Sequence, residues 1–203
     1  MGVICELINC GSASLPNQEK YRQSAIAAGL NRAIQKNIGD PQDLGAALAA
    51  YNSGKAMPKV KSVDVREFQP ILDAGAALDQ WNTAALAAVG TAYSIFQAIP
   101  APVNANNKLV VVYGVQVETT PLPVSRIIIR TGGAAGPAIG MYDLEQMVTR
   151  FEGFGYFSTP CVIDPSITWA VQVLCRIATG ALARVQLAAL IFEPADQTVV
   201  AQR

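Results

Sequence analysis

Apolar side chains recur with a two-residue period in the second half of the chain, and this pattern restricts the possible folds. In residues 109–117 every second side chain is apolar and the opposite side is mixed. The same alternation returns in residues 125–130, 167–177 and 185–191. Because successive side chains of a β-strand point to opposite faces, this period predicts strands with one buried face. Further strands are expected near residues 88–99, 139–142 and 154–163.

The connections between these segments indicate the kind of sheet. They are short and contain proline or glycine, as in residues 119–123 and 164–166, and no convincing helix follows residue 108. Parallel strands need long crossover connections, which are usually helices. We therefore predict a mainly β domain over residues 83–203, formed as an antiparallel two-sheet sandwich or a closed barrel.

The first third of the chain has a helical period instead. A helix is predicted over residues 18–36 after Asn17, and a second begins after Asp40 with Pro41 in its first position. Both apolar stripes are narrow and rich in alanine, so neither helix buries enough surface to be stable alone. Their main members are Ile26, Leu30, Ala33 and Ile34, then Leu44, Ala47, Leu48 and Tyr51. With an extended connector over residues 55–82, residues 1–82 are predicted to form a helical arm that docks on a neighbouring copy or another protein.

Composition excludes several functions. The 203 residues are 51% hydrophobic and 15% charged, with 15 basic residues, 15 acidic residues and no histidine. A chain without histidine has no Ser–His–Asp or Cys–His catalytic unit and no imidazole metal ligand. Zero net charge provides no general attraction to nucleic acid or to an anionic membrane. We expect a soluble, non-enzymatic protein with no cofactor, no direct nucleic-acid partner and no membrane association.

The four cysteines are expected to be structural. In a predicted hairpin over residues 161–177, Cys161 and Cys175 are roughly five residues out of register, which exceeds the ~7 Å Cα limit of a disulfide. We expect them to be reduced and packed as small apolar side chains, in a reducing compartment. Cys5 and Cys10 are close enough in sequence to pair, and the sequence leaves that pairing open.

Three local clusters are candidate sites of other kinds. The carboxylates of Asp143, Glu145 and Glu152 could serve a hydrolase, but they fall in a short polar connector. The glycine-rich residues 130–136 lack the following helix and the lysine of a phosphate-binding loop, so a surface loop is favoured. An aromatic group could form a platform for sugars or single-stranded nucleic acid, although packing in the core or in a subunit interface is favoured. Its members are Tyr142, Phe151, Phe154, Tyr156 and Phe157.

The succession of short strands from residue 84 to residue 194 resembles the single jelly rolls of viral and bacteriophage virion proteins. The most suggestive segments are residues 155–166, 169–175 and 183–193. They look like the closing strands of a jelly roll in phage capsid decoration or minor virion proteins. Cupins share the jelly roll, but their metal site uses several histidines, which this chain lacks.

The resemblance implies a structural role in a bacteriophage virion, assembled in the host cytoplasm. The implied partners are other copies of the chain, with a trimer as the form expected of a jelly-roll assembly, and other virion proteins such as a major capsid protein. Apolar contacts between subunits are expected at Ile26, Leu30, Ile34, Leu44, Leu48 and Tyr51 of the arm, and at Phe154 and Phe157. The alternatives are a carbohydrate-binding β-sandwich of a phage tail or adhesion protein and, third, a hydrolase.

Overall fold

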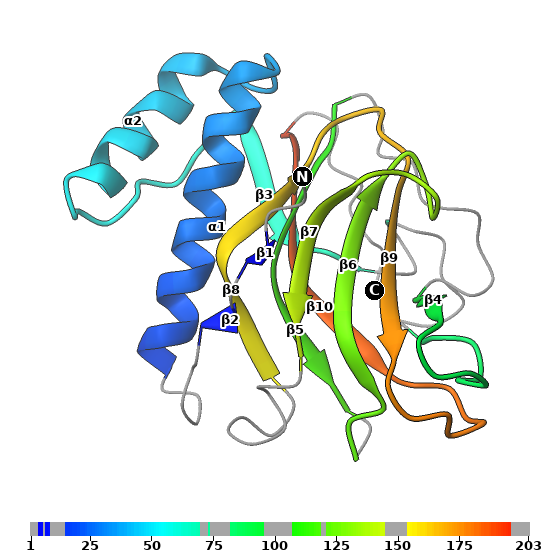
Figure 1. Cartoon of the computed structure of the whole chain (residues 1–203). Helices are drawn as coiled ribbons and strands as arrows, with labels where there is room; N and C mark the ends of the chain where they lie inside the picture. Colours follow the sequence, from blue (N-terminus) through cyan, green and yellow to red (C-terminus); the bar gives the residue numbers. More distant parts are fainter. Residues whose placement is uncertain are drawn as a thin grey trace.

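The computed structural model describes residues 4–5, 7–8, 15–69, 73, 82–95, 107–118, 121–144 and 154–195, with side chains from residue 19 and without that of residue 154. Over these residues the chain forms two packed β-sheets with two helices on one outer face (Figure 1). The helices are α1 (Leu15–Gln35) and α2 (Pro41–Asn52). The strands are β1 (Ile4–Cys5), β2 (Leu7–Ile8), β3 (Val63–Glu67), β4 (Ala92–Ser94), β5 (Leu109–Val117), β6 (Val124–Thr131), β7 (Ala138–Asp143), β8 (Phe154–Ile163), β9 (Trp169–Cys175) and β10 (Val185–Pro194).

The strands from β3 to β10 pair in a nested order. The first pairs with the last, the second with the seventh, the third with the sixth and the fourth with the fifth, and all four pairs are antiparallel. Pairing of β10 with β5 and of β6 with β9 joins them into two sheets, ordered β1-β7-β6-β9-β4 and β2-β8-β5-β10-β3. The prediction of a mainly β, antiparallel sandwich is confirmed, and the short β1 adds one parallel pair with β7.

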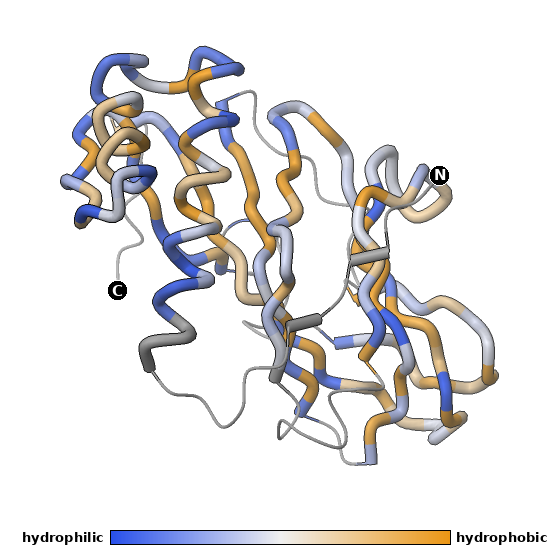
Figure 2. Tube along the Cα trace, turned by 60° about the vertical axis from the view of Figure 1, so that its left-hand side comes forward, coloured by the Kyte–Doolittle hydropathy of each residue, from blue (hydrophilic) through white to orange (hydrophobic). Residues whose placement is uncertain are grey.

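The core between the sheets is built from alternate residues of the central strands. Its largest members include Trp169, Ile127 and Ile129, which are almost completely buried. In Figure 2 the traces of these central strands contain long hydrophobic stretches. Cys161 and Cys175 form no disulfide and are buried in the same core, so the prediction that this pair is reduced and packed as apolar side chains is confirmed. Cys5 is described only by its backbone, and Cys10 lies outside the described residues.

Strand β5 is apolar on both faces. This corrects the expectation that alternate residues of segment 109–117 form a single apolar face opposite a mixed one. A register shift between Val112 and Gly114 changes which residues face inward, as a β-bulge does. Before the shift Val110 and Val112 face the core between the sheets, and after it Val115 and Val117 do. Leu109, Val111 and Tyr113 instead face the helices. The outer face of this sheet is therefore an apolar surface that a second layer covers.

That second layer is the α1–α2 pair. Leu30 of α1 and Leu44 of α2 are fully buried with Leu190 and Phe192 of β10 in one apolar cluster. Gly29 lies so close to β10 that a Cβ atom there would be 2.2 Å from the ring of Phe192. The expectation that the helices need another subunit to cover them is wrong, because their own sheet provides the surface. The predicted cap of α2 is confirmed, since the carboxylate of Asp40 accepts a hydrogen bond of 3.0 Å from the backbone N–H of Gln42.

An ion pair connects α1 with the turn between β8 and β9. Arg32 donates two hydrogen bonds to the carboxylate of Asp164, at 2.6 and 2.5 Å, and Lys36 Nζ lies 3.1 Å from it. The hydrogen bonds from Arg32, and then from Lys36, lower the pKa of Asp164 against the opposite effect of partial burial. The sequence predicted only a turn residue at this position.

This ion pair makes the stability of the fold dependent on pH. Because the pKa of Asp164 is lower in the folded state than its unfolded value of about 3.9, its contribution is complete above that value and is lost as the pH falls through the folded-state pKa. We expect Asp164→Asn to lower the free energy of unfolding by about 1 kcal/mol at pH 7, since both basic side chains are partly screened by solvent. Urea unfolding at pH 7 and near pH 3 measures this, and an equal deficit at both values would contradict it.

A buried ionic network contains the carboxylates of Asp73 and Glu193. Glu193 and Asp73 have almost fully buried side chains, and Arg66 bonds to both carboxylates. The guanidinium of Arg66 is 2.7 and 2.6 Å from the two oxygens of Asp73 and 2.9 Å from Glu193 Oε1. Lys108 Nζ lies 2.8 Å from Glu193 Oε2. The network joins the segment after β3 to β10 and to the start of β5.

Candidate interaction surface

The contact residues predicted from the sequence are largely used within the chain. Leu30, Leu44 and Phe157 are almost completely buried, so they are unavailable to another subunit and this part of the prediction is wrong. Ile26, Ile34 and Leu48 are half-buried and pack against the cluster beneath the helices. Tyr51 is half-buried as well, and the side chain of Phe154 lies outside the described residues.

The three aromatic candidates whose side chains the structure describes, Tyr142, Tyr156 and Phe157, do not form an exposed platform. Tyr142 and Phe157 stack with parallel rings inside the sandwich, at a centroid distance of 3.4 Å. Tyr156 is buried under α1, where it stacks on Tyr21 with 5.0 Å between ring centroids and on Tyr113 with 6.1 Å. The proposed sugar platform therefore loses Tyr142, Tyr156 and Phe157, because their ring faces are covered by other rings. Phe151 lies outside the described residues.

The other two candidate sites are the carboxylate cluster and the glycine-rich stretch. Neither forms a catalytic site within the described residues. Asp143 ends β7, while Glu145 and Glu152 lie outside the described residues. Within the described part of the chain, no three His, Cys, Asp or Glu side chains are grouped as a metal ion would require. The glycine-rich stretch forms the connection between β6 and β7, where Arg130 Nη1 donates to the carbonyl of Gly136 at 2.8 Å. Because a strand follows it rather than a helix, the interpretation as a surface loop is confirmed.

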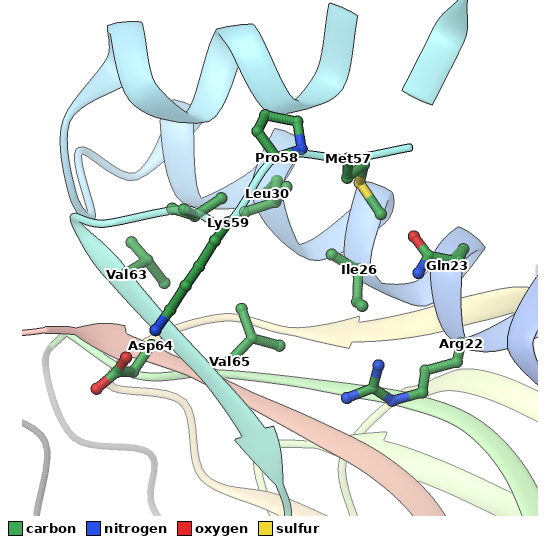
Figure 3. Close-up of a pocket in the computed structure, with 11 residues that line it drawn as sticks. Arg22, Gln23, Ile26, Leu30, Met57, Pro58, Lys59, Val63, Asp64 and Val65 are labelled. Atoms are coloured by element: carbon green, nitrogen blue, oxygen red, sulfur yellow. The ribbon is translucent and has the colours of Figure 1, made fainter. Parts of the chain in front are cut away.

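A groove of about 310 Å³ lies between α1, the segment before β3, and β3 itself (Figure 3). Ile26 and Leu30 line it from the helix, and Val63 and Val65 from the strand. Arg22, at its margin, pairs with Glu67 at 3.2 Å. Asp64 is the one carboxylate in the lining, which contains no serine, threonine or cysteine. The groove is thus a gap between a helix and the sheet that it covers, and its lining combines aliphatic side chains with Arg22, Gln23, Lys59 and Asp64.

An exposed surface with three large apolar side chains lies at one end of the sandwich. We call it the loop end, and define it as the exposed residues of segments 84–92 and 176–182. Eight residues are exposed in the first segment and seven in the second, and Arg176 is the single charged residue among them. The two segments lie side by side at the lower right of Figure 1, on the far side of the sandwich from α1 and α2.

Three large apolar side chains project from the loop end. The exposed fractions are 65% for Val89, 47% for Leu182 and 40% for Ile177. They stand among small side chains, since alanine occupies positions 84, 85, 87, 88, 92, 178 and 181. An exposed apolar surface with little charge is typical of a protein–protein contact.

Hydrogen bonds hold the loop end in one shape. The buried Leu86 and Ala183 anchor the two segments, and Thr83 Oγ1 accepts from the backbone N–H of Ala183 at 2.8 Å. The hydroxyl of Tyr93 accepts from two further N–H groups, those of Ala87 and Ala88. Backbone N–H···O bonds of 2.8–3.0 Å run from Thr83 to Ala183, Leu86 to Ala181, Gly180 to Leu86, Gly90 to Cys175 and Cys175 to Thr91.

Sequence reasoning missed this surface. It expected a strand near residues 88–99, whereas the described strand β4 covers only Ala92–Ser94. The available signal was the low charge of the alanine-rich segment, since residues 83–95 contain no Asp, Glu, Lys or Arg. That signal does not distinguish a buried strand from an exposed apolar loop.

Comparisons with known proteins give no relative: no family model matches the chain, and neither does any curated protein or solved structure. Among the helices of the described residues, none is both long and apolar enough to span a membrane.

Proposed function

We propose that the protein is a non-enzymatic structural component of a bacteriophage virion, either a capsid cement or decoration protein or a minor structural protein. The finer fold in this proposal is a jelly roll. The nested pairing of β3 with β10, β4 with β9, β5 with β8 and β6 with β7 supports it, because rolling up four nested strand pairs produces the two sheets of a jelly roll.

Jelly rolls serve mainly as capsid domains, lectins and cupins, and the chain argues against the last two. A cupin-like metal site needs histidines, and the sequence has none. A lectin-like stacking platform needs exposed aromatic faces, whereas Tyr142, Tyr156 and Phe157 are buried. A structural role is the function that these observations favour.

The loop end carries the proposal. An apolar surface held rigid by hydrogen bonds is suited to contact with protein, because burying apolar surface is favourable and few groups remain to be ordered on association. In this account the loop end replaces the helices as the main contact surface. The proposed partners are other copies of the chain and further virion proteins such as a major capsid protein.

Mass spectrometry of virus particles purified from a culture that produces this protein tests the proposed function directly. We expect the protein in the particles at many copies per particle, and we expect it to stay bound through a high-salt wash because salt does not screen apolar contacts. Finding the chain in the soluble lysate but not in particles would contradict the proposal. A glycan array with the purified protein should show no binding, since Tyr142, Tyr156 and Phe157 are buried.

A further inference from the structure

We propose that the loop end is the interface of a two-fold homodimer, in which it packs against the same surface of a second copy. The inference deepens the proposed function, and it rests on that function for the expectation that protein covers this surface. It names residues that the sequence did not, chiefly Val89, Ile177 and Leu182.

The chemistry of the surface restricts what can cover it. Its exposed side chains are aliphatic or small, with Thr91 and Thr179 as the side-chain hydroxyls and Arg176 as the one charge. A charged partner surface would lose hydration without gaining compensating ion pairs there. The partner surface must therefore also be apolar and nearly free of charge.

The loop end itself meets that description. In the described part of the chain, four large apolar side chains are exposed, and three of them belong to the loop end. The fourth, Ile139, borders a separate hollow of about 370 Å³ that also contains Asp164 and Thr131. Two-fold symmetry brings the same patch of two copies together, so it is the arrangement that pairs this surface with a matching one.

Size and rigidity set the expected affinity. The exposed residues of the two segments are fewer than the roughly 20–30 per side of a standard interface. The backbone hydrogen bonds between the segments reduce the entropy lost on association, since few groups remain to be ordered. A small but preorganised apolar interface predicts a dissociation constant in the micromolar range.

Sedimentation equilibrium of the full chain, from low to high micromolar concentration, tests this. We expect a monomer–dimer equilibrium whose larger species has about twice the mass of the 21.4 kDa chain. Leu182→Glu and Val89→Glu should each raise the dissociation constant at least about 100-fold, because a two-fold interface buries each new carboxylate twice. Ile139→Glu is the matched control: it places the same charge at a side chain that is 39% exposed, outside the interface. It should leave the dissociation constant unchanged.

Other results would overturn the proposal. These are a wild-type protein that stays monomeric, a trimer or larger closed ring, and a Leu182→Glu variant that still dimerises. Thermal unfolding of each variant separates loss of association from loss of folding, since substitutions at exposed loop positions should leave the midpoint of the dissociated protein nearly unchanged.

The outcome is separable from that of the proposed function. A dimer that is lost on Leu182→Glu, formed by a chain that is absent from particles, would support the interface and contradict the virion role. A chain that is present in particles but monomeric in solution at every concentration would support the virion role and contradict the interface.

Discussion

Replacing Arg66 by alanine lowers the free energy of unfolding by about 3–5 kcal/mol, as expected when one partner of a buried ion pair is removed. Arg66 is the shared cation of two buried carboxylates, bonding to both oxygens of Asp73 and to Glu193 Oε1. Lys108 would still face Glu193, but Asp73 would lose both of its hydrogen bonds from the guanidinium. A buried carboxylate without its cation bears the full cost of its desolvation, which explains the size of the effect.

Urea unfolding at pH 7 provides the measurement, and Arg22→Ala provides the control. Arg22 also pairs with a carboxylate, that of Glu67, but the Glu67 side chain is 57% exposed. Solvent-exposed ion pairs contribute about 0–1 kcal/mol, so Arg22→Ala should cost little. Equal losses in the two variants would show that the buried network does not stabilise the fold as described.

Two glycine-to-alanine substitutions in the helices should have effects of opposite sign. Gly29→Ala in α1 should destabilise the protein by about 1–3 kcal/mol, because the new methyl group would overlap the ring of Phe192. Gly45→Ala in α2 should stabilise it by about 0.5–1 kcal/mol, because nothing lies within 4 Å of the added methyl group and alanine is the better helix former.

Thermal and urea unfolding of both variants measure this difference. The sign of the Gly29→Ala effect is decisive, since helix propensity alone would make both variants more stable. A stabilised Gly29→Ala protein would mean that α1 does not rest on β10 in solution, and that the helices cover some other surface. Destabilisation of Gly29→Ala with stabilisation of Gly45→Ala would place the helical layer on its own sheet.

Helices, strands and caps could be predicted from the sequence because neighbouring residues determine them. The cap at Asp40, the two helices and the main strands follow from side-chain period and from proline and glycine positions. The side on which the helices dock could not be predicted, because a narrow apolar stripe shows that a helix must be covered and does not show by what. Because neither helix could be stable alone, we expected a neighbouring subunit to cover them, and that expectation was wrong.

The sequence pattern of β5 did not reveal the apolar sheet face on which the helices dock. Its alternation suggested one apolar face over residues 109–117, yet the bulge at Val112 and Gly114 divides those residues between two layers. A bulge shifts the facing of every later residue in the strand, and no local sequence pattern marked it. The same limit applies to Asp164, whose ion pair with Arg32 joins residues 132 positions apart.

Hydrogen–deuterium exchange of the full chain, compared at low and high protein concentration, tests whether the helices are covered within their own chain while the loop end assembles. We expect slower exchange at high concentration in segments 84–92 and 176–182, with no change in α1 and α2. Slower exchange in the helices together with an unchanged loop end would contradict it.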